Sequence, residues 1–134
     1  MNGAFLGLST ISGRAQGVGR RMKGKRVLIV EDCHLLAVTL EDMLTEAGAE
    51  VVAIAPSVAI ALKAIDRYVI DIACLDINLG FETSFPIADA LAMHGIPFVF
   101  VSAHEADVVP PTHRHRPFVR KTDAHLELVS ACGG

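Results

Sequence analysis

Carboxylates, a hydroxyl and an ammonium stand at the ends of four apolar runs in this sequence. They are Glu31 and Asp32, Asp76, Ser102 and Lys121. A carboxylate can act as a nucleophile or bind a hard divalent cation, and an ammonium can balance a transferred anion. Phosphoryl transfer requires these groups around one phosphorus atom. Three carboxylates and one ammonium sum to −2, a charge that favours the entry of a cation.

The apolar runs are predicted to be buried strands that alternate with helices. The expected strands cover residues 26–30, 51–55, 70–75, 97–101 and 118–119. Apolar residues recur at helical spacing between them, over 33–47, 58–65, 84–93 and 122–131. This alternation predicts an α/β fold, a doubly wound, five-stranded parallel sheet with helices on both faces. Functional residues of such sheets lie beyond the carboxyl ends of the strands, so the polar residues are expected to meet there.

The segment after the first strand argues against a nucleotide or flavin site. Cys33-His34-Leu35 stands where a phosphate-binding loop would need glycine or hydroxyl residues. Gly17-Val18-Gly19 precedes the first strand and therefore cannot serve as such a loop.

Charge and composition limit the domain organisation and the partners. The chain has 134 residues, enough for one domain, and its aliphatic runs are too short to span a membrane. Residues 1–26 contain six basic residues and no acid, whereas residues 27–134 contain six basic and fifteen acidic residues. The acidic core is not expected to bind nucleic acid. Residues 1–24 are predicted to be a flexible basic leader, either a tether or an extension without function, and residues 25–134 the folded domain.

The three cysteines, Cys33, Cys74 and Cys132, fit neither a disulfide framework nor a Cys-x-x-Cys zinc site. A reducing cytoplasm is therefore the expected location.

The polar residues at the strand ends resemble, in order and position, those of the receiver domain of two-component response regulators. The resemblance covers residues 25–131, and Pro97-Phe98-Val99-Phe100-Val101-Ser102-Ala103 is loosely similar to one subgroup of single-domain receivers. It implies a flavodoxin-like strand order 2-1-3-4-5. It also implies that Asp76 is the phosphoacceptor, that Ser102 is a hydroxyl switch and that Lys121 acts opposite the metal.

The expected cofactor is Mg²⁺, because all the candidate ligands are hard oxygens. The predicted ligands are Glu31, Asp32, Asp76 and the backbone carbonyl of Asn78. In receivers, positions two residues beyond the phosphoacceptor and the hydroxyl flank the path of the hydrolytic water. Asn78 and His104 stand there and are expected to tune the lifetime of the phosphorylated state.

The predicted function is a single-domain response regulator that takes a phosphoryl group from a histidine kinase or a histidine phosphotransfer protein. It would present an altered face to an unknown output protein, and a weak homodimer is compatible with the sequence. It would not be an enzyme beyond its own phosphotransfer and dephosphorylation. The alternative is a degenerate receiver that works as an interaction module independent of phosphorylation, with the basic leader or the loop at 113–116 as its contact surface.

Two features near the C-terminus depart from the family pattern, the segment around Pro110-Pro111 and the residue after Lys121. Pro110-Pro111 lies between Ser102 and the last strand, so the fourth helix is expected to be short or disordered, and His113-Arg114-His115-Arg116 is expected to be a solvated loop rather than a metal or phosphate site. Phe118 is either an aromatic switch or an ordinary strand residue. Thr122 follows Lys121 where receivers commonly have proline, and the Lys121-Thr122 peptide is predicted to be trans.

Overall fold

The computed structural model describes residues 21–103 and 106–133. The strands of the main sheet are β1 (Arg26–Val30), β2 (Glu50–Ala55), β3 (Ile72–Leu75), β6 (Phe98–Ser102) and β7 (Phe118–Arg120). The α-helices are α2 (His34–Glu46), α3 (Val58–Arg67), α4 (Phe85–Met93) and α5 (Ala124–Gly133). Residues 1–20, most of the predicted leader, and His104 lie outside the described part.

The main sheet has five strands in the order β2-β1-β3-β6-β7, and every neighbouring pair is parallel. This order is the predicted 2-1-3-4-5 pattern, because β4 (Asn78–Leu79) and β5 (Glu82–Thr83) form a separate antiparallel hairpin. The parallel α/β fold predicted from the alternating pattern is therefore confirmed. The hairpin was not predicted, because strands of two residues carry no measurable periodicity.

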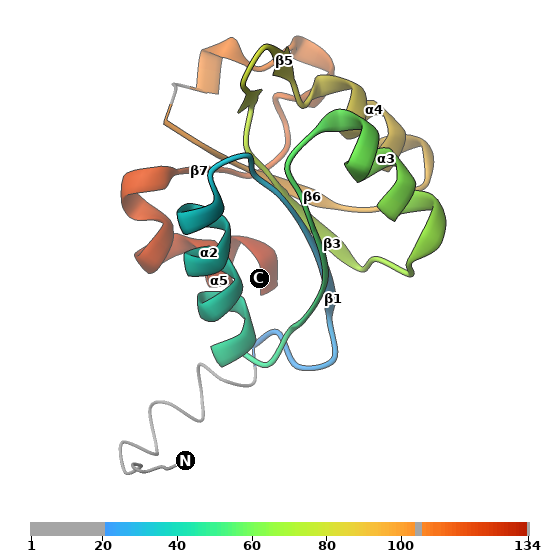
Figure 1. Cartoon of the computed structure of the whole chain (residues 1–134). Coiled ribbons are helices and arrows are strands. Elements are labelled where there is room, and N and C mark those ends of the chain that lie inside the picture. Colours follow the sequence, from blue (N-terminus) through green and yellow to red (C-terminus); the bar gives the residue numbers. More distant parts are fainter. Residues whose placement is uncertain (1–20, 104–105, 134) are drawn as a thin grey trace, which may run out of the picture.

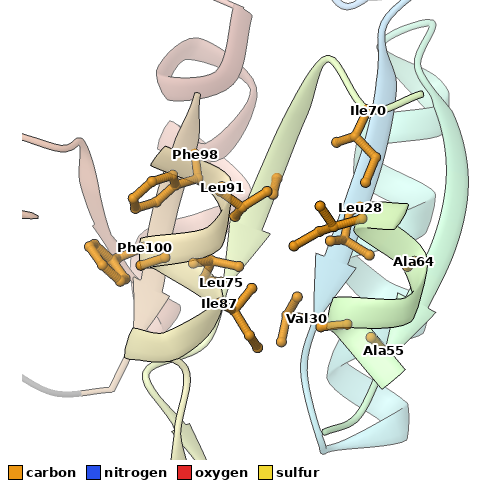
Figure 2. Close-up of a cluster of buried hydrophobic side chains, with 14 of the residues drawn as sticks. Leu28, Val30, Ala55, Ala64, Ile70, Leu75, Ile87, Leu91, Phe98 and Phe100 are labelled. Carbon is orange, nitrogen blue, oxygen red and sulfur yellow. The ribbon is translucent and has the colours of Figure 1, made fainter. Parts of the chain in front are cut away.

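Helices cover both faces of the sheet (Figure 1). α3 and α4 pack on the face that carries Leu28, Leu75 and Phe100, and Figure 2 shows this cluster. α2 and α5 pack on the opposite face, against alternate residues of the same strands such as Ile29 and Cys74. Because successive side chains of a strand point to opposite faces, a strand covered on both sides must be apolar throughout.

The helix ends follow local signals in the sequence. The Ser57 hydroxyl accepts a hydrogen bond from the Ile60 amide at 3.3 Å and so caps the start of α3. Pro86 lies in the first turn of α4, where its missing N–H costs no helical hydrogen bond. After α2 the chain turns at Gly48 with φ +100°, a conformation that favours glycine.

The folded part includes Met22, which the sequence analysis places in the leader. Its side chain is buried in the cluster under α2 and α5, and its amide donates to the Ala47 carbonyl at 2.8 Å. A single apolar side chain with no periodic neighbours gives no signal in the sequence, whereas its burial contributes about 1.5–3 kcal/mol.

Among the described residues, none of the helices combines the length and apolar character that crossing a membrane requires.

The described residues between β6 and β7 form two short 3₁₀ turns. They stand where the sequence analysis expects the fourth helix, the one that would follow β6 and is not α4. They are η1 (Ala106–Val108) and η2 (Pro111–His113). The expectation of a shortened fourth helix is therefore confirmed. Pro110 and Pro111 lack amide hydrogens and prevent a continuous helix at this point.

His113 closes the face that the shortened helix leaves uncovered, so the prediction of a solvated loop at 113–116 is wrong for His113, although Arg114 and His115 are exposed. Its side chain is 6% exposed, and the imidazole lies edge-on to the rings of Phe98 and Phe100, with centroids 5.6 and 6.5 Å away. Its Nε2 donates to Asp89 Oδ1 in α4 at 2.7 Å. The Arg116 guanidinium lies 4.3 Å from the centroid of the Phe98 ring. The sequence alone did not show these partners, which come from α4 and β6.

We expect His113→Ala to lower the free energy of unfolding by about 2–4 kcal/mol, because it leaves a cavity between two aromatic rings and removes the tie to α4. His115→Ala, two residues away on an exposed side chain, is the control and should stay within about 0.5 kcal/mol of the unsubstituted chain. Urea unfolding followed by circular dichroism measures both. Equal stabilities of the two variants would show that the imidazole contributes nothing to this face.

Candidate functional site

The strand ends bring the predicted site residues to one edge of the sheet. Glu31 follows β1 and Asp76 follows β3, and both carboxylates are buried, at 2% and 4% exposure. The Asp76 amide donates to the Val30 carbonyl at 2.9 Å, which fixes the two strand ends side by side. Asp32 is the next residue after Glu31 and is exposed. The carboxyl edge of the parallel sheet is therefore where the acidic residues meet.

Lys121 reaches this edge from the outer strand. It follows β7 and begins the 3₁₀ turn η3 (Lys121–Asp123). Its Nζ lies 3.1 Å from Asp76 Oδ2 and 3.4 Å from Glu31 Oε1 and Oε2. The described part of the chain contains no cis peptide bond, so the Lys121-Thr122 peptide is trans as predicted. The flexible side chain of lysine spans the distance without a cis turn.

Burial and neighbouring charges shift the pKa of Glu31. Burial raises the pKa of Glu31 most, followed by the charge of Asp76 and a hydrogen bond with that carboxyl group. The Cys33 amide, which donates to Glu31 Oε2 at 3.2 Å, and the Lys121 ammonium lower it. The net effect raises the pKa of Glu31 from 4.5 to about 7. One ammonium is therefore insufficient to keep both buried carboxylates fully charged at neutral pH.

The same contacts hold the proton on Lys121. Burial lowers the pKa of Lys121, but the hydrogen bond and charge of Asp76, together with Glu31, outweigh burial and raise the pKa above its ordinary value. Lys121 is therefore a permanent cation beside Asp76. It can balance an anion bound at that carboxylate.

The acidic residues fit a hard divalent cation. Carboxylate oxygens of Glu31, Asp32 and Asp76 all lie within 4.8 Å of one another. Glu31 Oε1 is buried and accepts no hydrogen bond, although it lies 3.4 Å from the Lys121 ammonium. A cation that takes oxygen ligands would satisfy this atom and offset the crowded negative charge. The residues present therefore fit Mg²⁺, the cofactor that the sequence predicts.

The hairpin fixes the backbone of Asn78, which follows Asp76 by two residues. The Ser84 amide donates to the Ile77 carbonyl at 2.9 Å, and Asn78 pairs with Thr83. Hydrogen-bonded and non-hydrogen-bonded pairs alternate along an antiparallel ladder, so the Asn78 carbonyl points to the edge of β4 away from β5. That orientation is compatible with the predicted role of this carbonyl as a ligand.

Ser102 and Phe118 lie on the adjacent strands β6 and β7, and Lys121 follows β7. Ser102 is the last residue of β6 and is fully buried, and in the sheet register it faces Arg120. Phe118 in β7 is half-buried and packs against the cluster under α3 and α4. In the sheet register Phe118 pairs with Phe100, two residues before Ser102.

A hollow of about 290 Å³ opens beside the acidic pair. It is lined by Glu31, Asp32, His34, Ala37, Ile54 and Pro56. Cys33 is exposed at this edge, whereas Cys74 and Cys132 are buried with their Sγ atoms 3.6 Å apart.

Comparison with known proteins identifies the family. The sequence model of one protein family, the response regulator receiver domain, matches residues 27–112, well over half of the chain. No curated protein matches the chain significantly. The fold and the matched model agree, and the chain belongs to the receiver domains of response regulators.

Several solved structures are similar to this chain. The solution structure of SdrG from Sphingomonas melonis Fr1 is 38% identical, with a TM-score of 0.71 over 83% of this chain and 93% of that chain. The BeF3-activated conformation of SdrG from Pseudomonas melonis Fr1 is 40% identical, with a TM-score of 0.67 over 79% of this chain and 93% of that chain. The response regulator PhyR from Brucella abortus is 26% identical, with a TM-score of 0.72 over 92% of this chain. The present chain spans only 53% of PhyR.

The raised pKa of Glu31 predicts a pH-dependent stability in metal-free buffer. The folded protein binds this proton more tightly than the unfolded chain does. The stability that the proton contributes is present below pH 4.5 and is lost as the pH rises through about 7. We therefore expect Glu31→Gln, which mimics the protonated form, to gain Tm relative to the unsubstituted chain between about pH 5 and 8.

The control is Glu46→Gln, at the exposed last residue of α2. Its Tm difference from the unsubstituted chain should not change over this range. Thermal unfolding in a chelator at several pH values measures both variants. A Tm difference for Glu31→Gln that stays constant with pH would contradict the assigned pKa.

Proposed function

We propose that this protein is a phosphoacceptor that takes a phosphoryl group on Asp76 in the presence of Mg²⁺. The observation that carries the proposal is the position of the Asp76 carboxylate, 3.1 Å from the Lys121 ammonium and within 4.8 Å of the carboxylates of Glu31 and Asp32. A nucleophile, a cation and a set of metal ligands therefore converge at one strand end. SdrG, the similar protein with a BeF3-activated conformation, supports the same assignment.

The proposed reaction uses each residue for one task. An Asp76 carboxylate oxygen attacks the donor phosphorus, an O–P bond forms, and the bond from phosphorus to the donor's nitrogen or oxygen breaks. Glu31 and Asp32 hold Mg²⁺ together with Asp76 and the Asn78 carbonyl. When bound, Mg²⁺ neutralises charge on the phosphoryl oxygens. Lys121 supplies the second positive charge from the opposite side.

The donor in this proposal is a histidine kinase or a histidine phosphotransfer protein, and the compartment is the cytoplasm. The protein catalyses only its own phosphorylation and dephosphorylation. The output is a changed protein-binding face. Ser102 would donate a hydrogen bond to the new phosphoryl group, and Phe118, on the adjacent strand, would move further inward as the hydroxyl shifts.

The test is incubation with Mg²⁺ and acetyl phosphate, followed by intact mass spectrometry. We expect the unsubstituted chain to gain one phosphoryl group, and Asp76→Ala to gain none because the attacking oxygen is absent. Asp32→Ala should slow the gain at least tenfold through weaker metal binding. Asp66→Ala, at an exposed position in α3, is the matched control and should be modified like the unsubstituted chain.

Two results would overturn the proposal. A phosphoryl group that persists in Asp76→Ala would place the acceptor elsewhere. No gain in the unsubstituted chain, either with acetyl phosphate or with a phosphorylated histidine phosphotransfer protein, would favour the alternative of an interaction module independent of phosphorylation.

We expect the lifetime of the phosphorylated state to depend on Asn78 and His104. Asn78 stands two residues after Asp76, where its side chain can orient a water near the phosphoryl group. Loss of intact phosphoprotein after removal of the donor measures the lifetime, and Asn78→Ala and His104→Ala should each change it several-fold. His125→Ala, in α5, is the control. An unaltered rate in either site variant removes that residue from the mechanism.

A further inference from the structure

A carboxylate of the β4–β5 hairpin binds the start of α3. Glu82 in β5 accepts a hydrogen bond from the Val58 amide at 2.9 Å through its Oε2. Val58 is the first residue of α3, so its amide has no partner within the helix. A carboxylate at this position also complements the positive end of the helix. Figure 1 shows the hairpin at the end of the sheet where α3 begins.

The ladder of the hairpin is short, although its base is buried at Ile77 and Ser84. Each strand has two residues, and they form only the pairs Asn78–Thr83 and Leu79–Glu82. Two-stranded hairpins are marginal in water without further packing. Leu79 is buried, but Phe81 at the tip is fully exposed and adds no packing. The contact from Glu82 to α3 therefore restrains the β5 side of the hairpin, and Leu79 restrains the β4 side.

The hairpin bears one of the proposed metal ligands. Asn78 lies in β4, two residues after Asp76, and its partner Thr83 is adjacent to Glu82 in β5. The orientation of the Asn78 carbonyl depends on the hairpin ladder. A ladder fixed at one end to α3 keeps this carbonyl at a constant position relative to the strand ends.

We propose that Glu82 is a positioning residue, which fixes the hairpin to the start of α3 and thereby holds the Asn78 carbonyl at the divalent cation site. This inference rests on the proposed function, because it concerns the same metal. It adds a residue that touches neither the cation nor the phosphoryl group. Partners that orient metal ligands in this way commonly change metal affinity about 10–100-fold when they are removed.

The experiment compares three variants of the full chain. Glu82→Ala removes both the hydrogen bond and the charge, and Glu82→Gln removes the charge but keeps an oxygen that can accept from the Val58 amide. Ser57→Ala removes the other cap of α3, the hydroxyl that accepts from the Ile60 amide, without touching the hairpin. Isothermal titration with Mg²⁺ measures affinity, and hydrogen exchange in chelator measures the protection of residues 77–84.

We expect Glu82→Ala to bind Mg²⁺ about tenfold more weakly and to exchange faster over residues 77–84 in the absence of metal. Glu82→Gln should retain most of the affinity and the protection. Ser57→Ala should lower the Tm as a lost helix cap does, while its Mg²⁺ affinity and the exchange of residues 77–84 stay unchanged.

Each contrary result has a distinct meaning. If Glu82→Ala has the same Mg²⁺ affinity and the same hydrogen exchange over residues 77–84 as the unsubstituted chain, the inference is overturned and the proposed function stays intact. An equal loss in Glu82→Gln and Glu82→Ala would also overturn it, because charge alone would then account for the effect. If the unsubstituted chain bound no Mg²⁺, both the proposed function and this inference would be wrong.

Discussion

The ion cluster of Glu31, Asp76 and Lys121 is the interaction on which the architecture of this receiver depends. Two carboxylates are buried within reach of one ammonium, and a buried charge without a partner costs several kcal/mol. The ammonium comes from the end of β7, the outer strand, whereas the carboxylates follow β1 and β3 near the centre. β6 and β7 must therefore pair in the correct register before the site can form. Even then the charges do not balance, and the raised pKa of Glu31 expresses the remaining excess of negative charge.

The parallel sheet is what allows such charges to gather. Its central strands are covered on both faces and admit only apolar side chains. Polar residues are confined to the strand ends, where the strands stop and loops reach solvent. In a parallel sheet all carboxyl ends lie on the same edge. Membership in the receiver family and the geometry of the acidic site therefore have one physical origin, the placement of polar residues after buried strands.

The segment between β6 and β7 shows how this chain covers a core with a shortened helix. Two 3₁₀ turns provide less apolar surface than a helix, and a histidine fills the remaining space between two phenylalanine rings. The bond from His113 to Asp89 also connects this segment to α4. The β4–β5 hairpin follows a similar principle on the other side of the site, since Glu82 connects it to α3. In both cases one polar side chain substitutes for packing that a short segment cannot supply.

The sequence by itself determined the five strands of the main sheet, the four α-helices, the sheet class and the identity of the polar residues at the strand ends, because these depend on local patterns. Apolar runs of strand length and the spacing of Leu36, Leu40 and Leu44 in α2 are properties of neighbouring residues. Only the tertiary structure decided that His113 and Met22 are buried, that Glu82 binds the start of α3, and that Glu31 holds its proton to about pH 7. Each of these depends on residues far apart in the chain. Their contacts and their electric fields exist only after the sheet has assembled.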